Sequence, residues 1–521
     1  MTDKQQLPHS FYITTAIHYA NAGPHLGHAY EAVLGDIVAR YWRQQGVDTF
    51  FLSGTDEHGD KILRAAAKAD KGPQAFVDAN SKQFVDLYRD LNLSNDDFIR
   101  TSDKHKHWPG VRAMWEAIEA KGDIYKDTYE GLYCVGCEAF LTEKELVDGK
   151  CPSHQTEPEL VREDNYFFKL SRYVEEVRHA IKTDQYEILP HGRKNEILAL
   201  LDDGVVDVSF SRPERDIPWG IPVPGDPGQN IYVWCDALTN YVSALGYGST
   251  DDATFRSFWP ANAHIVGKDI ARFHAIIWPA MLLSAGLPLP QKLWIHGFIT
   301  SGGVKMSKSI GNVIDPKEYL NEYGVDAFRY YLGREISPFE DGDFTKERFE
   351  ETYNANLANG LGNLLSRTIK MATQYFDGTV SRGLSEDLPL PVKRDGMTGE
   401  HKVTGYTIRY VIANELFPAY HEHMRNFQLQ GAADVIWELI GLLDGYIATY
   451  EPYKLIKTDT EKTENCIYNV LVGIDAVREM IGPFMPHTAE AIHEVITHEG
   501  KGGTDMAFSV QPLEAPLFAR I

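Results

Sequence analysis

Cysteine is scarce in this sequence, and the few that occur do not make a disulfide pattern. Five cysteines are present among 521 residues, and three of them lie at positions 134, 137 and 151. A secreted domain held by disulfides normally carries an even set of cysteines spread along the chain. The odd number and the clustering therefore predict a reducing, cytoplasmic environment and a local metal site.

Long apolar runs are lacking as well. The most apolar run, from Ala275 to Leu283, is far shorter than a membrane-spanning helix requires, and it contains Pro279. The residues that follow Met1 do not have the basic-then-apolar order of a secretory signal. We therefore expect a soluble protein that has no membrane partner.

Positive charge is in deficit. The chain has 51 Lys and Arg residues against 74 Asp and Glu residues, which gives a net charge of −23. Because such a chain repels a polyanion at long range, the net charge argues against unspecific nucleic-acid binding, whereas binding through local contacts stays open. A chain of 521 residues is also too long for a single hydrophobic core, so about two to four domains are expected.

Strand and helix patterns alternate in the first hundred residues. Val33, Ile37, Val38 and Tyr41 recur at helical spacing behind a β-rich run. The expected elements are a strand at 11–15, a helix at 28–46, a strand at 49–53, a helix at 73–91 and a strand at 97–100. This alternation predicts an α/β fold with a doubly wound parallel sheet, in which ligands bind beyond the carboxyl ends of the strands.

His25-Leu26-Gly27-His28 stands where the first strand gives way to the first helix. A helix N-terminus attracts anions, and two imidazoles there can hydrogen-bond a phosphate as charge builds up on it. Gly27 leaves room for a nucleotide to approach the backbone. A metal pair or an accidental surface pair are the alternatives for a bare His-x-x-His, and the strand-to-helix position favours phosphate.

A second candidate for phosphate binding is the loop from Gly302 to Asn312. It carries Lys305 and Lys308 among serines and glycines. Ammonium groups on flexible stems suit phosphate oxygens, and glycine-hinged loops commonly gate active sites. A loop of this composition is more often plain solvated surface, so its interpretation depends on the histidine turn far upstream.

Between about 121 and 230 the strand–helix alternation is interrupted by a hairpin that bears Cys134 and Cys137, followed by Cys151 and His154. A Cys-x2-Cys pair followed by Cys-x2-His matches the ligand spacing of structural, tetrahedral zinc. The alternative, a redox dithiol, leaves Cys151 and His154 without a role. We therefore predict a structural zinc site with these four ligands.

The histidine turn and the Lys-Met-Ser-Lys-Ser loop together resemble the motifs of class I aminoacyl-tRNA synthetases, and the methionyl family in particular. The resemblance is dense from about residue 10 to 370 and then thins. It is carried by the stretches 20–24, 54–59, 130–134, 165–168, 218–222 and 232–237. It implies a Rossmann-like catalytic sheet with an inserted zinc-bearing α+β domain and a C-terminal α-helical bundle.

The reaction that this resemblance implies needs no covalent nucleophile. Methionine and ATP give methionyl-adenylate and pyrophosphate, and the methionyl group then passes to the 3′ end of tRNA(Met), initiator and elongator alike. His25 and His28 act on the reacting phosphate, while Lys305 and Lys308 close over the β and γ oxygens with Mg²⁺. The residues expected to bind ATP are His25, Gly27, His28, Gly267, Asp269, Lys305 and Lys308.

The same resemblance implies a methionine pocket. Its expected lining is Ala16, Ile17, Tyr19, Asp56, Val233, Trp234, Ala237, Leu238, Tyr241, Ile270 and His274. An unbranched thioether packs well on an aromatic face such as Trp234, and Asp56 can pair with the substrate ammonium. Tyr241 and His274 can present weak donors to sulfur. Without the resemblance, such an apolar-aromatic cluster reads as ordinary core.

Helical periodicity dominates after residue 350, at 432–448 and 467–481, interrupted by a polar stretch at 377–406. The resemblance implies that this part reads the anticodon. The expected contacts are Asn363, Arg367 and Tyr453. Tyr453 stands where the family has a stacking tryptophan, with Trp437 as a rival, and a plain packing role for Asn363 stays open.

The expected domain limits follow from these patterns and from the resemblance. They are 10–120 and 230–300 for the two halves of the catalytic domain, 121–229 for the inserted domain, 301–350 for the lysine loop with a stem-contact region, and 351–521 for the helical anticodon-binding domain. Because no oligonucleotide-binding barrel, through which some relatives dimerise, follows the helices, we expect a monomer.

Three positions depart from the family pattern. His18 stands where relatives usually have Pro or Tyr, Leu238 replaces a Pro of some relatives, and Cys235 beside Trp234 replaces Leu or Phe. Cys235 raises the expectation of a thiol-sensitive site.

Two other classes remain as alternatives. Leucine, isoleucine and valine enzymes need an editing insertion for which the sequence has little room, and a cysteine enzyme would place zinc at its substrate. A non-catalytic RNA-binding relative would have lost His25, His28 or Lys308, and all three residues are present.

Overall fold

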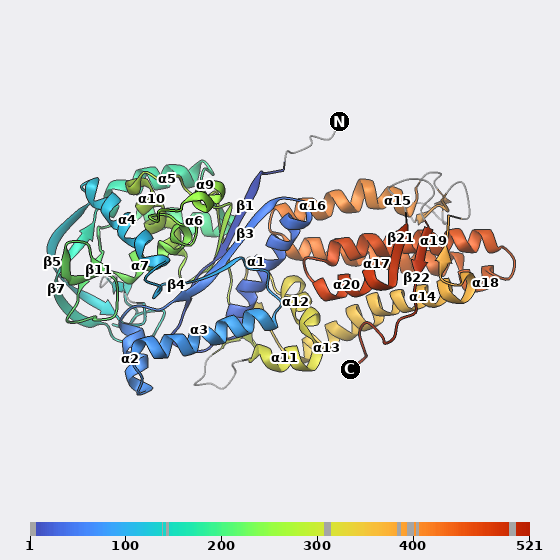
Figure 1. The fold of residues 1–521 in the computed structure, drawn as a ribbon, viewed down its shortest axis with the longest axis horizontal. Helices are drawn as coiled ribbons and strands as arrows, with labels where there is room; N and C mark the ends of the chain where they lie inside the picture. The colour runs from blue at the N-terminus through green and yellow to red at the C-terminus, as the bar shows by residue number, and fades with distance from the viewer. Residues whose placement is uncertain are drawn as a thin grey trace. The chain divides into compact units, whose positions relative to one another are not determined.

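A computed structural model describes residues 7–137, 139–141, 145–306, 314–382, 387–392, 401–402, 406–499 and 507–521. The chain divides into two compact units (Figure 1). The first unit comprises Met1–Phe298 and Ile314–Pro316, and the second comprises Ile299–Val313 and Lys317–Ile521. Among the described residues, no helix has both the length and the apolar content that crossing a bilayer requires.

A parallel sheet forms the centre of the first unit. Its strands run in the order β2-β3-β1-β13-β14-β8, with β4 paired to β3. Their bounds are β1 Ser10–Thr15, β2 His18–Tyr19, β3 Asp48–Asp56, β4 Asp97–Arg100, β8 Glu187–Leu189, β13 Ala263–Gly267 and β14 Lys292–His296. The described strands of this sheet all pair in parallel, which confirms the predicted doubly wound α/β fold.

Helices connect and cover these strands. Their bounds are α1 Leu26–Gln44, α2 Asp60–Lys68, α3 Pro73–Asp90, α4 His107–Ala120 and α10 Trp278–Ala285. Val33, Ile37, Val38 and Tyr41 of α1 are all buried, as their helical spacing predicts. Strand β13 is buried at every position and β1 at all but its first, so neither strand shows the alternation of apolar and polar residues that a half-exposed strand has.

The segment between β4 and β13 builds further sheets. A four-stranded antiparallel sheet has the order β6-β5-β7-β9, and β10, β12 and β11 form a second one. The bounds are β5 Ile124–Cys134, β6 Ala139–Leu141, β7 Glu159–Phe168, β9 Val208–Ser209, β10 Ser211–Pro213, β11 Pro222–Val223 and β12 Asp226–Ile231, with α5 Val174–Lys182, α6 His191–Asp202, α7 Val233–Leu238, α8 Asn240–Ser243 and α9 Ala253–Phe258. Strand β8 leaves this segment and joins the central sheet beside β14.

The second unit begins with a small sheet and continues as helices. The sheet consists of β15 Ile299–Ser301, β16 Val304–Lys305 and β17 Gly342–Asp343. The helices are α11 Pro316–Tyr323, α12 Val325–Arg334, α13 Lys346–Thr352, α14 Asn363–Phe376, α15 Ile408–Val411, α16 Phe417–Arg425, α17 Leu429–Tyr450, α18 Pro452–Leu455, α19 Thr460–Ile481 and α20 Pro486–Val495. The predicted helical stretches 432–448 and 467–481 fall inside α17 and α19.

Short strands complete the second unit. Strands β18 Thr379–Val380, β22 Ala507–Val510 and β21 Ile496–Glu499 form one sheet, and β19 Pro391–Val392 pairs with β20 His401–Lys402. The polar stretch at 377–406 is therefore partly extended, and its residues 383–386, 393–400 and 403–405 lie outside the described residues.

Candidate active site

His25 and His28 form the N-terminal cap of α1, directly beyond β1 and β2. The Gly27 N–H donates to His25 Nδ1, and the His25 N–H donates to His28 Nδ1, both over 3.1 Å. The two rings stack with centroids 3.8 Å apart. A side chain at Gly27 would approach the His25 ring to 3.0 Å, so glycine keeps this turn open.

These contacts fix the tautomers of both imidazoles. Each Nδ1 accepts a backbone hydrogen, so in the neutral rings the proton of His25 and of His28 lies on Nε2, where it can be donated to an anion. Burial, together with the neighbouring His25 and His18, lowers the pKa of His28. His28 is therefore a neutral hydrogen-bond donor at physiological pH.

His18, one of the three departures from the family pattern, packs behind this turn. It is buried, its ring lies 4.6 Å from that of His28, and its Nε2 is 2.8 Å from the Tyr88 hydroxyl. Its other face stacks on Phe84 at 5.3 Å. Burial, with the nearby His25 and His296, lowers the pKa of His18 to about 3, so it supports the turn as an uncharged ring.

The residues expected to bind methionine come from several elements of the first unit. Eight of them belong to one hydrophobic cluster: Ala16, Ile17, Tyr19, Val233, Trp234, Leu238, Tyr241 and Ile270. The other three, Asp56, Ala237 and His274, are buried. Cys235, the neighbour of Trp234, is also buried, and burial raises the pKa of its thiol, so the expected thiol sensitivity is not supported.

Tyr241 and His274 form a buried pair within this cluster. The Tyr241 hydroxyl lies 2.7 Å from His274 Nε2, and His274 Nδ1 lies 3.0 Å from the Ile270 carbonyl oxygen. Burial lowers the pKa of His274 to about 4, so the ring is neutral and its proton sits on Nδ1, facing that carbonyl. Tyr241 therefore donates to Nε2, and both polar hydrogens of the pair are used inside the protein.

Trp234 is held by an aromatic partner that the sequence did not single out. Its ring stacks on Phe273 with centroids 3.7 Å apart and planes 6° apart, and its Nε1–H donates to the Cys137 carbonyl over 3.4 Å. Phe273 directly precedes His274, and its position next to this expected pocket residue is the only signal in the sequence that could have pointed to Phe273. The pair presents a flat aromatic surface of the kind that suits a polarizable thioether.

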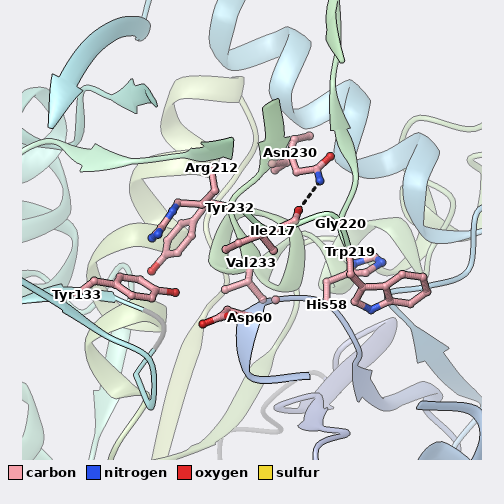
Figure 2. A pocket seen from close by; sticks show the side chains of 12 residues that line it. His58, Asp60, Tyr133, Arg212, Ile217, Trp219, Gly220, Asn230, Tyr232 and Val233 are labelled. Atoms are coloured by element: carbon pink, nitrogen blue, oxygen red, sulfur yellow. Dashed lines mark hydrogen bonds between the residues drawn. The ribbon is translucent and has the colours of Figure 1, made fainter. Parts of the chain in front are cut away.

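A small cavity adjoins the start of α7 (Figure 2). It measures about 20 Å³, and His58, Trp219, Tyr232 and Val233 are among its lining residues. The Asn230 amide, drawn there, donates to the Ile217 carbonyl over 2.8 Å. This cavity holds at most about one water molecule, so the side chains around it are closely packed.

The end of β13 supplies the residues expected to hold adenosine. A side chain at Gly267 would come within 2.8 Å of the Asp269 carboxylate, whereas Asp269 itself is exposed. Behind this strand end, His296 Nε2 lies 2.9 Å from Glu31, whose other oxygen accepts from the Ala16 N–H over 2.8 Å. Although burial opposes it, the contact with Glu31 raises the pKa of His296.

The lysine loop begins in the second unit. Lys305 ends β16, and Lys308 lies outside the described residues. Gly302 and Gly303 have φ values of 62° and 73°, which only glycine adopts readily, and they form the turn before β16. The Gly303 N–H donates to Asp343 over 2.8 Å, so β17 anchors the base of the loop.

The four predicted metal ligands lie together. Their ligand atoms are all within 4.8 Å of one another, and the individual separations include 3.5 Å between Cys137 and Cys151 and 3.3, 3.7 and 3.9 Å from His154 Nδ1 to Cys137, Cys151 and Cys134. Four ligands around tetrahedral zinc lie about 3.8 Å apart for sulfur pairs and about 3.6 Å for sulfur and nitrogen. A side chain at Gly136 would collide with the His154 ring. These residues fit a zinc ion.

Comparisons with known proteins identify the family of this chain. The family described as tRNA synthetases class I (M) matches residues 11–159 and 144–369. The methionine–tRNA ligase of Thermotoga maritima is 42% identical over 496 residues, covering 94% of this chain and 76% of that protein. That of Brucella suis is 40% identical over 527 residues and covers 98% of both chains. The chain belongs to the methionine–tRNA ligase family of class I tRNA synthetases.

A solved member of this family has the same fold. The structure of Mycobacterium tuberculosis methionyl-tRNA synthetase in complex with methionyl-adenylate matches with a TM-score of 0.88 and 35% identity, covering 98% of this chain and 100% of that one. The resemblance inferred from the histidine turn and the lysine loop is thereby confirmed, together with the expected enzyme class, an aminoacyl-tRNA-forming ligase.

The anticodon residues expected from the methionine–tRNA ligase family lie on the surface of the second unit. Asn363 and Arg367 share an exposed face of α14, and Arg367 lies 3.6 Å from Asp444 of α17. Tyr453 on α18 has 46% of its surface exposed. The rival Trp437 instead packs on Tyr330, with ring centroids 4.5 Å apart, so its face is already covered.

Proposed function

We propose that this chain, as a methionine–tRNA ligase, activates methionine at the carboxyl edge of the central sheet. The observation that carries this assignment is the pair of fixed tautomers at the histidine turn. His25 and His28 both present Nε2 hydrogens at a helix N-terminus, where an anion gains from orphan N–H groups as well. Hydrogen-bond donors set in advance around a reacting phosphate stabilise the charge that develops in the transition state.

The substrate side chain occupies the aromatic cluster. Its thioether packs on Trp234 beside Phe273, and its ammonium pairs with Asp56 at the end of β3. The carboxylate of methionine then attacks the α-phosphorus of ATP in line, and pyrophosphate leaves. Because no covalent bond to the protein forms, the rate comes from positioning and from charge stabilisation.

The remaining groups act on ATP. Gly267 and Asp269 hold adenosine, and Lys305 and Lys308 contact the β and γ phosphates. Mg²⁺, when bound with ATP, supplies further neutralisation of those phosphates. After activation, a terminal ribose hydroxyl of tRNA takes over the methionyl group and AMP leaves.

Amino-acid-dependent exchange between ATP and pyrophosphate tests this function. All twenty amino acids are assayed with the wild-type chain, and His28→Ala serves as the control. Exchange with methionine alone, lost in His28→Ala, is the expected result. Exchange with a different amino acid would overturn the assignment of Trp234, Tyr241 and His274, and tRNA binding without any exchange would favour a non-catalytic relative.

We propose further that Cys134, Cys137, Cys151 and His154 hold one structural zinc ion. Four protein ligands close the coordination sphere, so zinc would fix the hairpin and take no part in the reaction. The Trp234 indole bonds to the Cys137 carbonyl, so this hairpin also borders the methionine pocket. Metal analysis of the purified chain should give about one zinc per molecule. Cys151→Ser should lose it, and a fully active chain without zinc would contradict the proposal.

The second unit is proposed to recognise tRNA(Met), both initiator and elongator, through Asn363, Arg367 and Tyr453. Exposed tyrosine and arginine side chains suit stacking and base-edge contacts to splayed anticodon bases. We also propose a monomer in the cytoplasm, where the five cysteines, which form no disulfide, would stay reduced. The domain limits proposed are 10–120, 121–229, 230–300, 301–350 and 351–521.

A further inference from the structure

A buried carboxylate on α7 takes no part in the reaction described above. Asp236 is fully buried and lies between two histidines from distant parts of the chain. Its Oδ2 is 2.6 Å from His58 Nδ1, and its Oδ1 is 2.7 Å from His107 Nε2. The remaining nitrogen of His107, Nδ1, is 2.8 Å from the Ser243 hydroxyl.

The direction of these hydrogen bonds follows from the charge of Asp236. Burial opposes ionisation, but the two imidazoles outweigh it and lower the pKa of Asp236. An ionised carboxylate only accepts, so His58 Nδ1 and His107 Nε2 both donate to it. Ser243 can then donate to His107 Nδ1. This arrangement satisfies a buried charge with two hydrogen bonds, which a fold retains only if the geometry is closely held.

The elements that Asp236 joins are the walls of the proposed methionine pocket. Asp236 itself lies on α7 between Trp234 and Ala237, and His58 stands two residues after Asp56. The His58 carbonyl also accepts from the Tyr19 hydroxyl over 2.9 Å. One carboxylate therefore connects the helix that faces the substrate side chain with the strand end that faces its ammonium.

His107 adds a third element to this connection. It begins α4, and its ring is fully buried. The peptide unit after Asp56 is tied down independently, because the Trp219 indole donates to the Glu57 carbonyl over 2.6 Å and the Glu57 N–H donates to Thr101 over 2.8 Å. His58 and Trp219 lie next to each other at the small cavity shown in Figure 2.

We propose that Asp236 is a positioning residue for methionine, which sets the distance between Asp56 and α7 by holding His58 and His107. The inference rests on the proposed function, because it concerns the same pocket. A substrate bound at both its ammonium and its side-chain end needs those two contacts at a fixed spacing. When the carboxylate is lost, α7 and the end of β3 are no longer tied, and the two contacts cannot both be made at full strength.

Replacing the carboxylate tests this role. Asp236→Ala should raise the KM for methionine by about 10- to 100-fold in pyrophosphate exchange, since displacements of about 1 Å at a site can cost about that factor. The KM for ATP should change far less, because the histidine turn and the end of β13 are not held by Asp236. A role in folding alone would lower the melting temperature without this selective change.

Asp123→Ala is the matched control. Asp123 is also a fully buried carboxylate of the first unit, and it accepts from Arg172, Tyr173 and Ser284. Its loss should lower the melting temperature comparably but leave the KM for methionine unchanged. Equal effects of Asp123→Ala and Asp236→Ala on this KM would overturn the proposal.

A conservative variant separates shape from charge. Asp236→Asn can keep both contacts if His107 moves its proton to Nδ1 and donates it to Ser243. The amide group of the new asparagine then donates to His107 Nε2, and its oxygen accepts from His58 Nδ1. We expect Asp236→Asn to recover most of the methionine affinity that Asp236→Ala loses. An Asn variant as weak as the Ala variant would show that hydrogen-bonded spacing is not what Asp236 supplies.

A second variant keeps the test decisive if Asp236→Ala does not fold. His58→Ala removes one of the two contacts and leaves the carbonyl that holds Tyr19, so it should raise the KM for methionine severalfold. An unchanged KM for methionine in His58→Ala, with exchange intact, would refute the inference alone. A wild-type chain without methionine-dependent exchange would instead refute the proposed function.

Discussion

Removing the Tyr241 hydroxyl should weaken methionine binding selectively. In Tyr241→Phe the ring is kept and only the space of the hydroxyl opens, while His274 Nε2 loses the hydrogen that it accepts over 2.7 Å. Both side chains are nearly inaccessible, with 1% of Tyr241 and 2% of His274 exposed. When the pocket of the variant is empty, water can hydrate the orphaned nitrogen. Bound methionine would expel that water, and a thioether has no hydrogen to offer in its place.

The size of this effect follows from the cost of an unsatisfied buried acceptor. That cost is about 1–3 kcal/mol, which corresponds to about a 5- to 150-fold rise in the KM for methionine. Homocysteine carries an S–H that can donate to Nε2, so it should lose less affinity than methionine. The variant should therefore discriminate less well between the two amino acids.

Pyrophosphate exchange with each amino acid measures both quantities. Tyr186→Phe is the matched control, because its buried hydroxyl donates to the backbone carbonyl of the same residue, His274, over 2.9 Å. It should cost stability without changing the preference for methionine over homocysteine. An unchanged KM for methionine in Tyr241→Phe, or equal losses for methionine and homocysteine, would refute the reasoning.

Three further results are expected. His28→Ala should lower the exchange rate by about 10²- to 10³-fold with little change in the KM for methionine, since it removes a donor to the reacting phosphate; an effect on that KM alone would contradict this role. Burial lowers the pKa of His18 to about 3 and of His274 to about 4, whereas an unfolded histidine titrates near about 6.5, so the unfolded chain binds these protons first as the pH falls. The free energy of unfolding should then decrease below about pH 6.5, by up to about 1.4 kcal/mol per pH unit for each of the two histidines. Urea unfolding between about pH 7 and pH 5 measures this decrease, and a free energy of unfolding that stays constant over that range would refute the prediction. Arg367→Ala and Tyr453→Ala should raise the KM for tRNA in aminoacylation and leave pyrophosphate exchange as in the wild type, and normal charging by both would remove them from the anticodon contact.

Local patterns predicted much of the fold. The helix that begins at the histidine turn, the strands at 11–15 and 49–53, and the four metal ligands could be found because each depends on residues close in sequence. Spacing of three or four residues shows a buried helix face, and Cys-x2-Cys with Cys-x2-His shows a ligand set. These features could therefore be predicted from the sequence without knowledge of any tertiary contact.

Contacts between residues far apart in the sequence could not be predicted from local patterns. His296 lies 265 residues from Glu31, and Asp236 lies 178 residues from His58, yet each pair is in hydrogen-bond contact. Strand β8 joins the central sheet from within the segment read as an insertion. Periodicity within a segment carries no information about its partner, so such contacts emerge only from the assembled sheet.

The internal hydrogen bonding of the proposed methionine pocket leads to an expectation about which side chains it accepts. The Tyr241 hydrogen is donated to His274, and the His274 hydrogen is donated to the Ile270 carbonyl, so neither of these two hydrogens is available to a substrate. The amide oxygen of glutamine would receive no hydrogen from this pair, and an unpaired buried acceptor costs about 1–3 kcal/mol. A thioether needs no partner and gains about 0.3–1.5 kcal/mol from contact with an aromatic ring such as Trp234. If methionine occupies this pocket as proposed, glutamine should be poorly accepted, whereas norleucine, which matches the shape of methionine without its sulfur, should lose only the sulfur–aromatic contact.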